Sequence, residues 1–171
     1  MKSPLFAFHL AAVLVAAVCV WSMRHELTEK ATGRFGWALP PALAVVVALI
    51  LLYVSPGKRF ELWTAAFIAG LALGLGAGIL LKVDTDFERK LVRVHRAWDG
   101  VGVATLLFLL ALVRFVTSEL MTRPSGRFGV LGAVAVFLAT YLCARVITLR
   151  YYTAPKAIHL DMVRGRKPPG D

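Results

Sequence analysis

The chain has 171 residues, of which 58% are hydrophobic and only 18% are charged. A soluble domain of this size could not bury so much apolar surface, so the composition excludes an ordinary soluble protein and indicates a chain embedded in lipid. The formal net charge of +10 in such a chain indicates membrane topology and contact with anionic lipid rather than nucleic-acid binding, for which the sequence holds no recognition motif.

Five apolar segments predict an all-α membrane protein with five transmembrane helices in one bundle. Crossing a hydrocarbon core of about 30 Å takes about 20 residues, and the polar joints are too short to hold a soluble domain. The first run ends in Trp21, Met23 and Arg24 rather than in a small-residue cleavage site, which favours an uncleaved span over a signal peptide. The segments cover residues 5–23, 37–54, 62–81, 101–121 and 129–149, so residues 1–149 form the transmembrane domain and residues 150–171 a basic tail.

Two prolines, Pro40 and Pro41, lie near the start of the second segment. Proline lacks a backbone N–H and is tolerated best in the first turn of a helix, where that donor has no intrahelical acceptor. We therefore expect the second helix to begin at this pair.

The third segment has one face of small residues, because Ala66, Gly70, Gly74 and Gly78 recur at every fourth position. Glycine is common in membrane helices generally. A regular stripe of it nevertheless lets two helix backbones approach closely. We expect this face to pack against another helix and the segment to lie centrally in the bundle.

The charged joint over residues 82–100 fits two structures. β-Branched or aromatic residues alternate with polar, ionisable residues over residues 83–87 and 92–95, and this alternation favours a β-hairpin. Apolar residues at helical spacing from Phe87 to Trp98 fit a basic amphipathic helix equally well. The pattern alone leaves both open.

Two arginines inside the apolar segments are candidates for a polar intramembrane site. A charge within a span costs at least ~2.5 kcal/mol on insertion scales, so each arginine needs compensating interactions. Arg114 either snorkels toward the nearer interface or faces the bundle interior, where carbonyls or an anion would satisfy it. Arg145 lies four residues from the predicted end of the last span and is expected to snorkel.

Other chemistry has little support in the residues. Apart from Glu119 near the end of the fourth, the predicted spans hold no acidic residue and no paired carboxylates, which removes the usual proton relay of a pump. Cys19 and Cys143 have the chemistry of a dithiol, but free buried cysteine is more often a small apolar residue. The four histidines do not face one another within the spans, and no metal or phosphate motif occurs. We therefore expect neither a cofactor nor a metal.

Counts of Lys and Arg predict the orientation. The N-terminus and the second and fourth joints carry five of these residues, whereas the first and third joints and the tail carry thirteen. Cytoplasmic loops retain an excess of Lys and Arg. We expect the N-terminus outside, the C-terminus in the cytoplasm, and the basic face against anionic lipid.

Short motifs follow one another in order along most of the chain. They are the Pro40-Pro41 pair, YVSP at residues 53–56, the Glu61-led third segment, the charged third joint, LVRFV around Arg114 and ARVITLRYY around Arg145. With these motifs the sequence resembles the CcdC-like family of small bacterial integral membrane proteins, for which no biochemical activity is established. The resemblance implies a bacterial inner membrane, favours the hairpin in the third joint, and marks both arginines as part of the family pattern.

The sequence therefore predicts a multi-pass membrane protein that acts as a non-enzymatic accessory or scaffold, together with another membrane protein or with itself. Two alternatives remain open. One is a redox or cytochrome c maturation helper that uses Cys19 and Cys143. The other is a small transporter or anion-binding protein built on Arg114.

Overall fold

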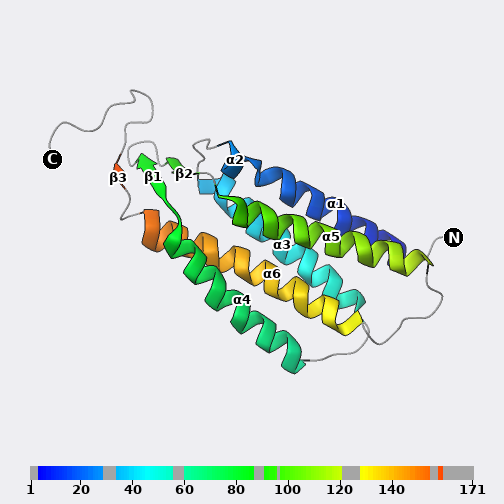
Figure 1. Ribbon diagram of the computed structural model, residues 1–171. Helices are drawn as coiled ribbons and strands as arrows, with labels where there is room; N and C mark the ends of the chain where they lie inside the picture. Colours follow the sequence, from blue (N-terminus) through cyan, green and yellow to red (C-terminus); the bar gives the residue numbers. More distant parts are fainter. Residues whose placement is uncertain are drawn as a thin grey trace.

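Helices dominate the computed structural model, which describes residues 4–28, 34–55, 60–86, 91–95, 97–120, 128–154 and 158–159. Five helices are long and apolar enough to cross a membrane, which confirms the predicted all-α membrane protein with its spans in one bundle (Figure 1). The helices are α1 (Pro4–Ser22), α2 (Arg24–Leu27), α3 (Arg34–Val54), α4 (Phe60–Leu80), α5 (Trp98–Leu120) and α6 (Phe128–Thr148), and a π-helical turn η1 (Leu149–Thr153) continues α6.

The apolar spans begin and end within three residues of the predicted positions, because uninterrupted apolar length determines them. They cover Leu5–Ser22, Gly36–Val54, Phe60–Leu80, Trp98–Ser118 and Val130–Tyr151. The difference that matters most is at the fourth span, which begins at Trp98 rather than at residue 101. Asp99 consequently belongs to the first turn of a membrane-spanning helix.

Four of the spans, α1, α3, α5 and α6, pack around a core that is rich in alanine. Small side chains let the helices approach closely, which matters in a bilayer because lipid tails remove the hydrophobic drive for helix association. Larger side chains such as Val47, Leu107 and Leu142 fill the remaining core volume. The fully buried alanines are Ala12, Ala16, Ala44, Ala104 and Ala135.

Helix α4 lies at the edge of the bundle, against α6, and not at its centre (Figure 1). Only 17% of its span is buried, compared with half of the span formed by α6. The expected central position was therefore wrong. A single small-residue face accommodates a single neighbouring helix, and the other faces of α4 carry large exposed apolar side chains.

The glycine face of α4 is the surface that contacts α6. A methyl group added at Gly70 would lie 2.5 Å from the carbonyl oxygen of Phe137, and one at Gly74 would overlap the carbonyl oxygen of Tyr141. At Gly78 the added carbon would lie 2.6 Å from Cβ of Thr148. These glycines are needed because the α6 backbone occupies the space of a side chain, while Ala66 is half-buried at the start of the same stripe.

The proline pair lies inside α3 rather than in its first turn. The helix begins at Arg34, six residues before Pro40, so the expected start was wrong. Each proline removes one intrahelical hydrogen bond from the helix. Trp37, in the additional N-terminal segment, is buried against the strands described next.

Two short strands, β1 (Val83–Asp86) and β2 (Leu91–Val94), form an antiparallel hairpin between α4 and α5. The structure thus selects the hairpin over the amphipathic helix. A third strand, β3 (Ile158–His159), pairs in parallel with β1 and gives the order β2-β1-β3. Because Val83 is opposite Val94, the valines share one face of the hairpin.

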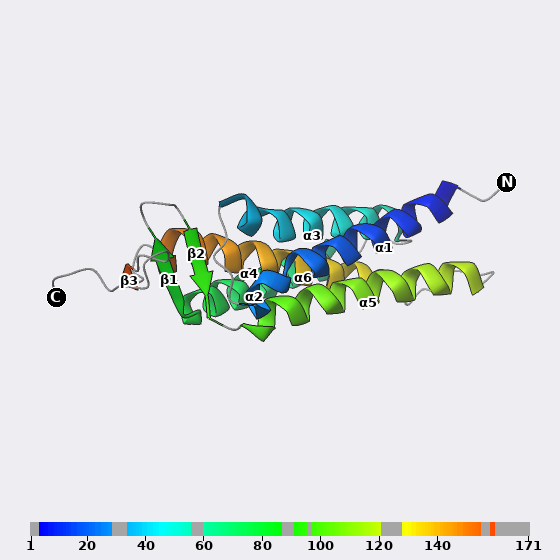
Figure 2. The same ribbon diagram turned by 90° about the horizontal axis from the view of Figure 1, so that it is seen from above.

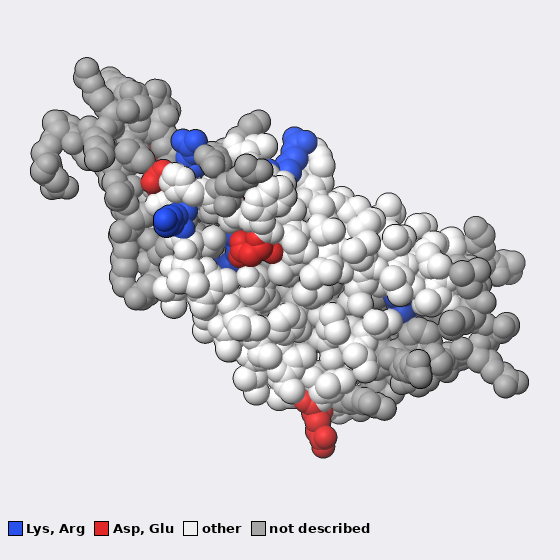
Figure 3. All heavy atoms as spheres, viewed as in Figure 1, with Lys and Arg blue, Asp and Glu red and all other residues white. Residues whose placement is uncertain are grey.

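That valine face packs on the helices and fixes the hairpin to the bundle. Val83 and Val94 join Trp37, Val146 and Leu149 in a second apolar cluster. The end of the bundle with the three strands is called the strand-bearing end, and α1 begins at the opposite end (Figures 1 and 2). Charged residues gather at the strand-bearing end, and the visible surface along the helices carries few of them (Figure 3).

Candidate functional site

Glu26, Asp99, Tyr141 and Arg145 form a hydrogen-bonded group at the strand-bearing end, which we call the Arg145 cluster. Nη1 and Nη2 of Arg145 donate to Oε1 and Oε2 of Glu26 at 2.8 and 2.9 Å. Nε and Nη2 donate to Oδ2 and Oδ1 of Asp99 at 2.7 and 3.2 Å. The hydroxyl of Tyr141 donates to Oδ2 of Asp99 at 3.1 Å. One guanidinium therefore holds two carboxylates, each through both of its oxygens.

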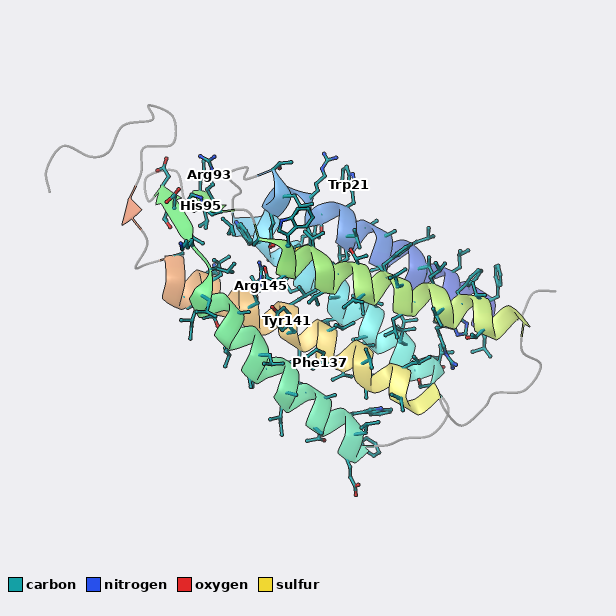
Figure 4. The ribbon with its side chains drawn as sticks, in the orientation of Figure 1. Trp21, Arg93, His95, Phe137, Tyr141 and Arg145 are labelled. Carbon is teal, nitrogen blue, oxygen red and sulfur yellow. The ribbon has the colours of Figure 1, made fainter. Side chains whose placement is uncertain are left out.

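Three segments distant in sequence bring these side chains together. Tyr141 and Arg145 are four residues apart on α6, so they lie on one helix face. Asp99 lies in the first turn of α5, and Glu26 in α2, the short helix after the first span. Figure 4 shows Tyr141 and Arg145 next to each other along α6.

Gly100 makes room for the cluster in the first turn of α5. A methyl group there would lie 2.6 Å from Oε2 of Glu26 and from Cε of Met23, and 3.0 Å from Nη1 of Arg145. The absence of a side chain at this one position lets the glutamate and the guanidinium meet beside the α5 backbone.

Burial makes the Arg145 cluster energetically important. The side chains of Arg145 and Glu26 are fully buried, whereas Asp99 is 37% exposed. Moving ions out of water costs several kcal/mol each, which short bidentate hydrogen bonds offset. Removing one partner would leave the other charges buried without compensation. The cluster therefore links α2, α5 and α6 at the membrane boundary.

The sequence interpretation of Arg145 was wrong. Arg145 does not snorkel but pairs with Glu26 and with Asp99, which belongs to the fourth span because that helix begins three residues earlier than predicted. Glu26 and Asp99 were missed as site residues because both were assigned to polar joints. The available signal was the Tyr141 and Arg145 spacing on one face of a span, which calls for acceptors nearby.

Arg114 lies near the opposite end of the bundle and is not brought close to Arg145. Its side chain is buried, with the residue 7% exposed, and Nη2 donates to the carbonyl oxygen of Val54 at 3.1 Å. Val54 is the last residue of α3, where the helix dipole concentrates partial negative charge. The guanidinium therefore neutralises a helix C-terminus. The side chain of Glu119, five residues further along α5, lies outside the described residues.

The two thiols lie on either side of α3. Sγ of Cys19 donates to the carbonyl oxygen of Pro40 at 3.4 Å, and Sγ of Cys143 lies 3.9 Å from that of Pro41. Successive carbonyls of a helix point about 100° apart around its axis. The thiols, one from α1 and the other from α6, are thus directed at different sides of the same turn.

The histidines that the structure describes are engaged separately. Nδ1 of His9 lies 2.8 Å from the carbonyl oxygen of Leu5 within α1, and His95 pairs with Asp84 on the hairpin at 3.0 Å. The side chains of His25 and His159 lie outside the described residues. Within the part of the chain that the structure describes, no three His, Cys, Asp or Glu side chains are grouped for a metal.

Comparison with known proteins found no relative of this chain. No protein-family model, curated protein or solved structure matches the chain. Its function is therefore inferred from its own residues and contacts.

Proposed function

We propose that the chain is a non-enzymatic accessory or scaffold protein of a bacterial inner membrane. Its N-terminus lies outside, and its strand-bearing end lies in the cytoplasm against anionic lipid. The observation that supports this proposal is the Arg145 cluster, in which the charged groups pair with one another.

A guanidinium has five N–H donors, and four hydrogen bonds join that of Arg145 to Glu26 and Asp99. A substrate could take its place only by breaking a bidentate ion pair in a buried setting. Cross-linking of helices explains this arrangement better than binding or catalysis does.

The exposure of α4 supports association with another membrane protein. The buried residues in this span are Gly70, Gly74 and Gly78, all on the face used by α6. Large apolar side chains such as Ile68 and Leu73, which are 60% and 59% exposed, cover the other faces. A peripheral span of this kind can dock on a partner helix without disturbing the core of the bundle.

The orientation rests on the excess of Lys and Arg at the strand-bearing end. With five spans, the two termini must lie on opposite sides of the membrane. The motifs given above also favour membership of the CcdC-like family. A tag at Asp171 should therefore become accessible only after the cells are permeabilised, and labelling in intact cells would overturn this orientation.

Site-specific photocrosslinking in native membranes tests the proposed role. A photoreactive residue at Ile68 should give an adduct of defined mass with a second membrane protein. The same residue at Leu106, which is 56% exposed on α5, is the matched control and should give lipid adducts alone.

Two other results would contradict the proposal. Anion uptake into proteoliposomes that Arg114→Leu abolishes would favour the transporter. Reversible oxidation of Cys19 and Cys143 in native membranes, with loss of c-type cytochromes in the double alanine variant, would favour the redox helper.

A further inference from the structure

Trp21 and Arg24 form an exposed pair where α1 ends and α2 begins. Cζ of Arg24 lies 4.4 Å from the centroid of the Trp21 ring, within the range of a cation–π contact. Trp21 is 63% exposed and projects from the outer surface of α1 in Figure 4. Both side chains carry N–H donors, so the pair presents a cation and an indole N–H on one surface.

Within the part of the chain that the structure describes, no acidic side chain neutralises the charge of Arg24. Glu26, two residues away, gives both carboxylate oxygens to Arg145 on the buried side of α2. Among the described residues, no carboxylate forms an ion pair with Arg24. The surface at Trp21 therefore keeps a full positive charge, which favours an anion.

A row of exposed apolar side chains continues from this pair along α1. Leu10, Leu14 and Val18 follow one another at four-residue spacing and are 39%, 58% and 49% exposed, and Trp21 completes the row. From Leu10 to Trp21 a helix rises about 16 Å. This length matches one leaflet of a hydrocarbon core that is about 30 Å thick.

We propose that Trp21 and Arg24, with the row Leu10, Leu14 and Val18, bind one anionic phospholipid. The phosphate accepts hydrogen bonds from the guanidinium and from the indole N–H, and an acyl chain lies along the apolar row. The leaflet-length row beneath the cation distinguishes a lipid from an acidic protein segment, which would need no such row. The inference rests on the proposed function only in placing the strand-bearing end at the level of the headgroups.

Native mass spectrometry of the full chain, with phosphatidylglycerol or phosphatidylcholine added, tests the site. The protein should retain phosphatidylglycerol preferentially, and Arg24→Gln should weaken that retention roughly fivefold, the effect of one cation at a lipid surface. Trp21→Leu, which removes the indole N–H and the ring, should weaken it as well.

Lys82→Gln is the matched control, because Lys82 is an exposed cation of the same end outside the pair. It should leave retention nearly unchanged. Equal losses in the Arg24 and Lys82 variants would overturn a discrete site in favour of diffuse charge, and no loss in the Arg24 variant would overturn the proposal outright. Thermal unfolding of each variant checks its fold. This experiment uses purified protein, so a failed crosslink at Ile68 or a reversed orientation would leave its outcome unchanged.

Discussion

The two buried arginines, one near each end of the bundle, satisfy their charges in different ways. Arg145 holds the carboxylates of Glu26 and Asp99, which come from two other segments. Arg114 donates to a backbone carbonyl at the end of α3. A charged residue in an apolar span can thus either connect several helices or cap one of them, and the kind of partner decides which.

This difference predicts unequal consequences when each arginine is lost. Removing Arg145 leaves two carboxylates without their cation, and one of them is fully buried. Removing Arg114 takes a donor from the carbonyl of Val54 at the end of α3, which is an uncharged acceptor and not a buried carboxylate. The strand-bearing end should therefore be the more sensitive of the two.

The largest effect is expected from Arg145→Met, which keeps much of the side-chain volume and removes the charge. Loss of one partner from a buried ion pair costs about 3–5 kcal/mol. The unfolding temperature in detergent and the abundance of the variant in membranes should both fall. A variant as stable as the wild type would show that the Arg145 cluster does not connect the helices.

Arg114→Leu should have a smaller effect, of about 1.5–3 kcal/mol, which is the range for loss of a hydrogen bond from a charged donor such as the one to the Val54 carbonyl. The same unfolding assay, run beside Arg145→Met, gives the comparison. Arg114→Lys should recover part of the loss, since an ammonium also donates to the Val54 carbonyl. If Arg114→Leu proved the more damaging variant, the proposed contrast between the two ends would be reversed.

Gly100→Ala tests how tightly the helices pack around the Arg145 cluster. The added methyl group would press on Glu26 and Arg145, and overpacking of this kind costs about 1–3 kcal/mol. Gly102→Ala is the matched control, because a methyl group at Gly102 meets nothing within 4 Å. It should be neutral or stabilising by up to about 1 kcal/mol through helix propensity. Equal effects at the two glycines would argue against tight packing around the cluster.

The sequence predicted the spans well because apolar length alone defines them. It left the third joint open, since the alternation around Val83 and the helical spacing around Leu91 were both present. Packing of Val83 and Val94 against Trp37 decides for the hairpin, and that contact depends on how α3 begins. The glycine stripe indicated that α4 has a close neighbour, but a stripe does not reveal how many neighbours a helix has.

The Arg145 cluster could not be derived from sequence for a related reason. Glu26 lies 119 residues from Arg145, and Asp99 lies 46 residues from it. Both carboxylates lie at the ends of polar joints, where acidic residues are ordinary. Only the folding of α2 and α5 onto α6 brings them to the guanidinium.

A thermodynamic cycle on the Arg145 cluster tests the central claim most directly. Unfolding in detergent should be measured for Arg145→Met, for the double variant Glu26→Gln with Asp99→Asn, and for all three changes together. We expect Arg145→Met to cost much less when both carboxylates are already neutral, with a coupling free energy of about 2–3 kcal/mol. Additive effects, with coupling near zero, would contradict the conclusion that Arg145 joins α2, α5 and α6 through these two carboxylates.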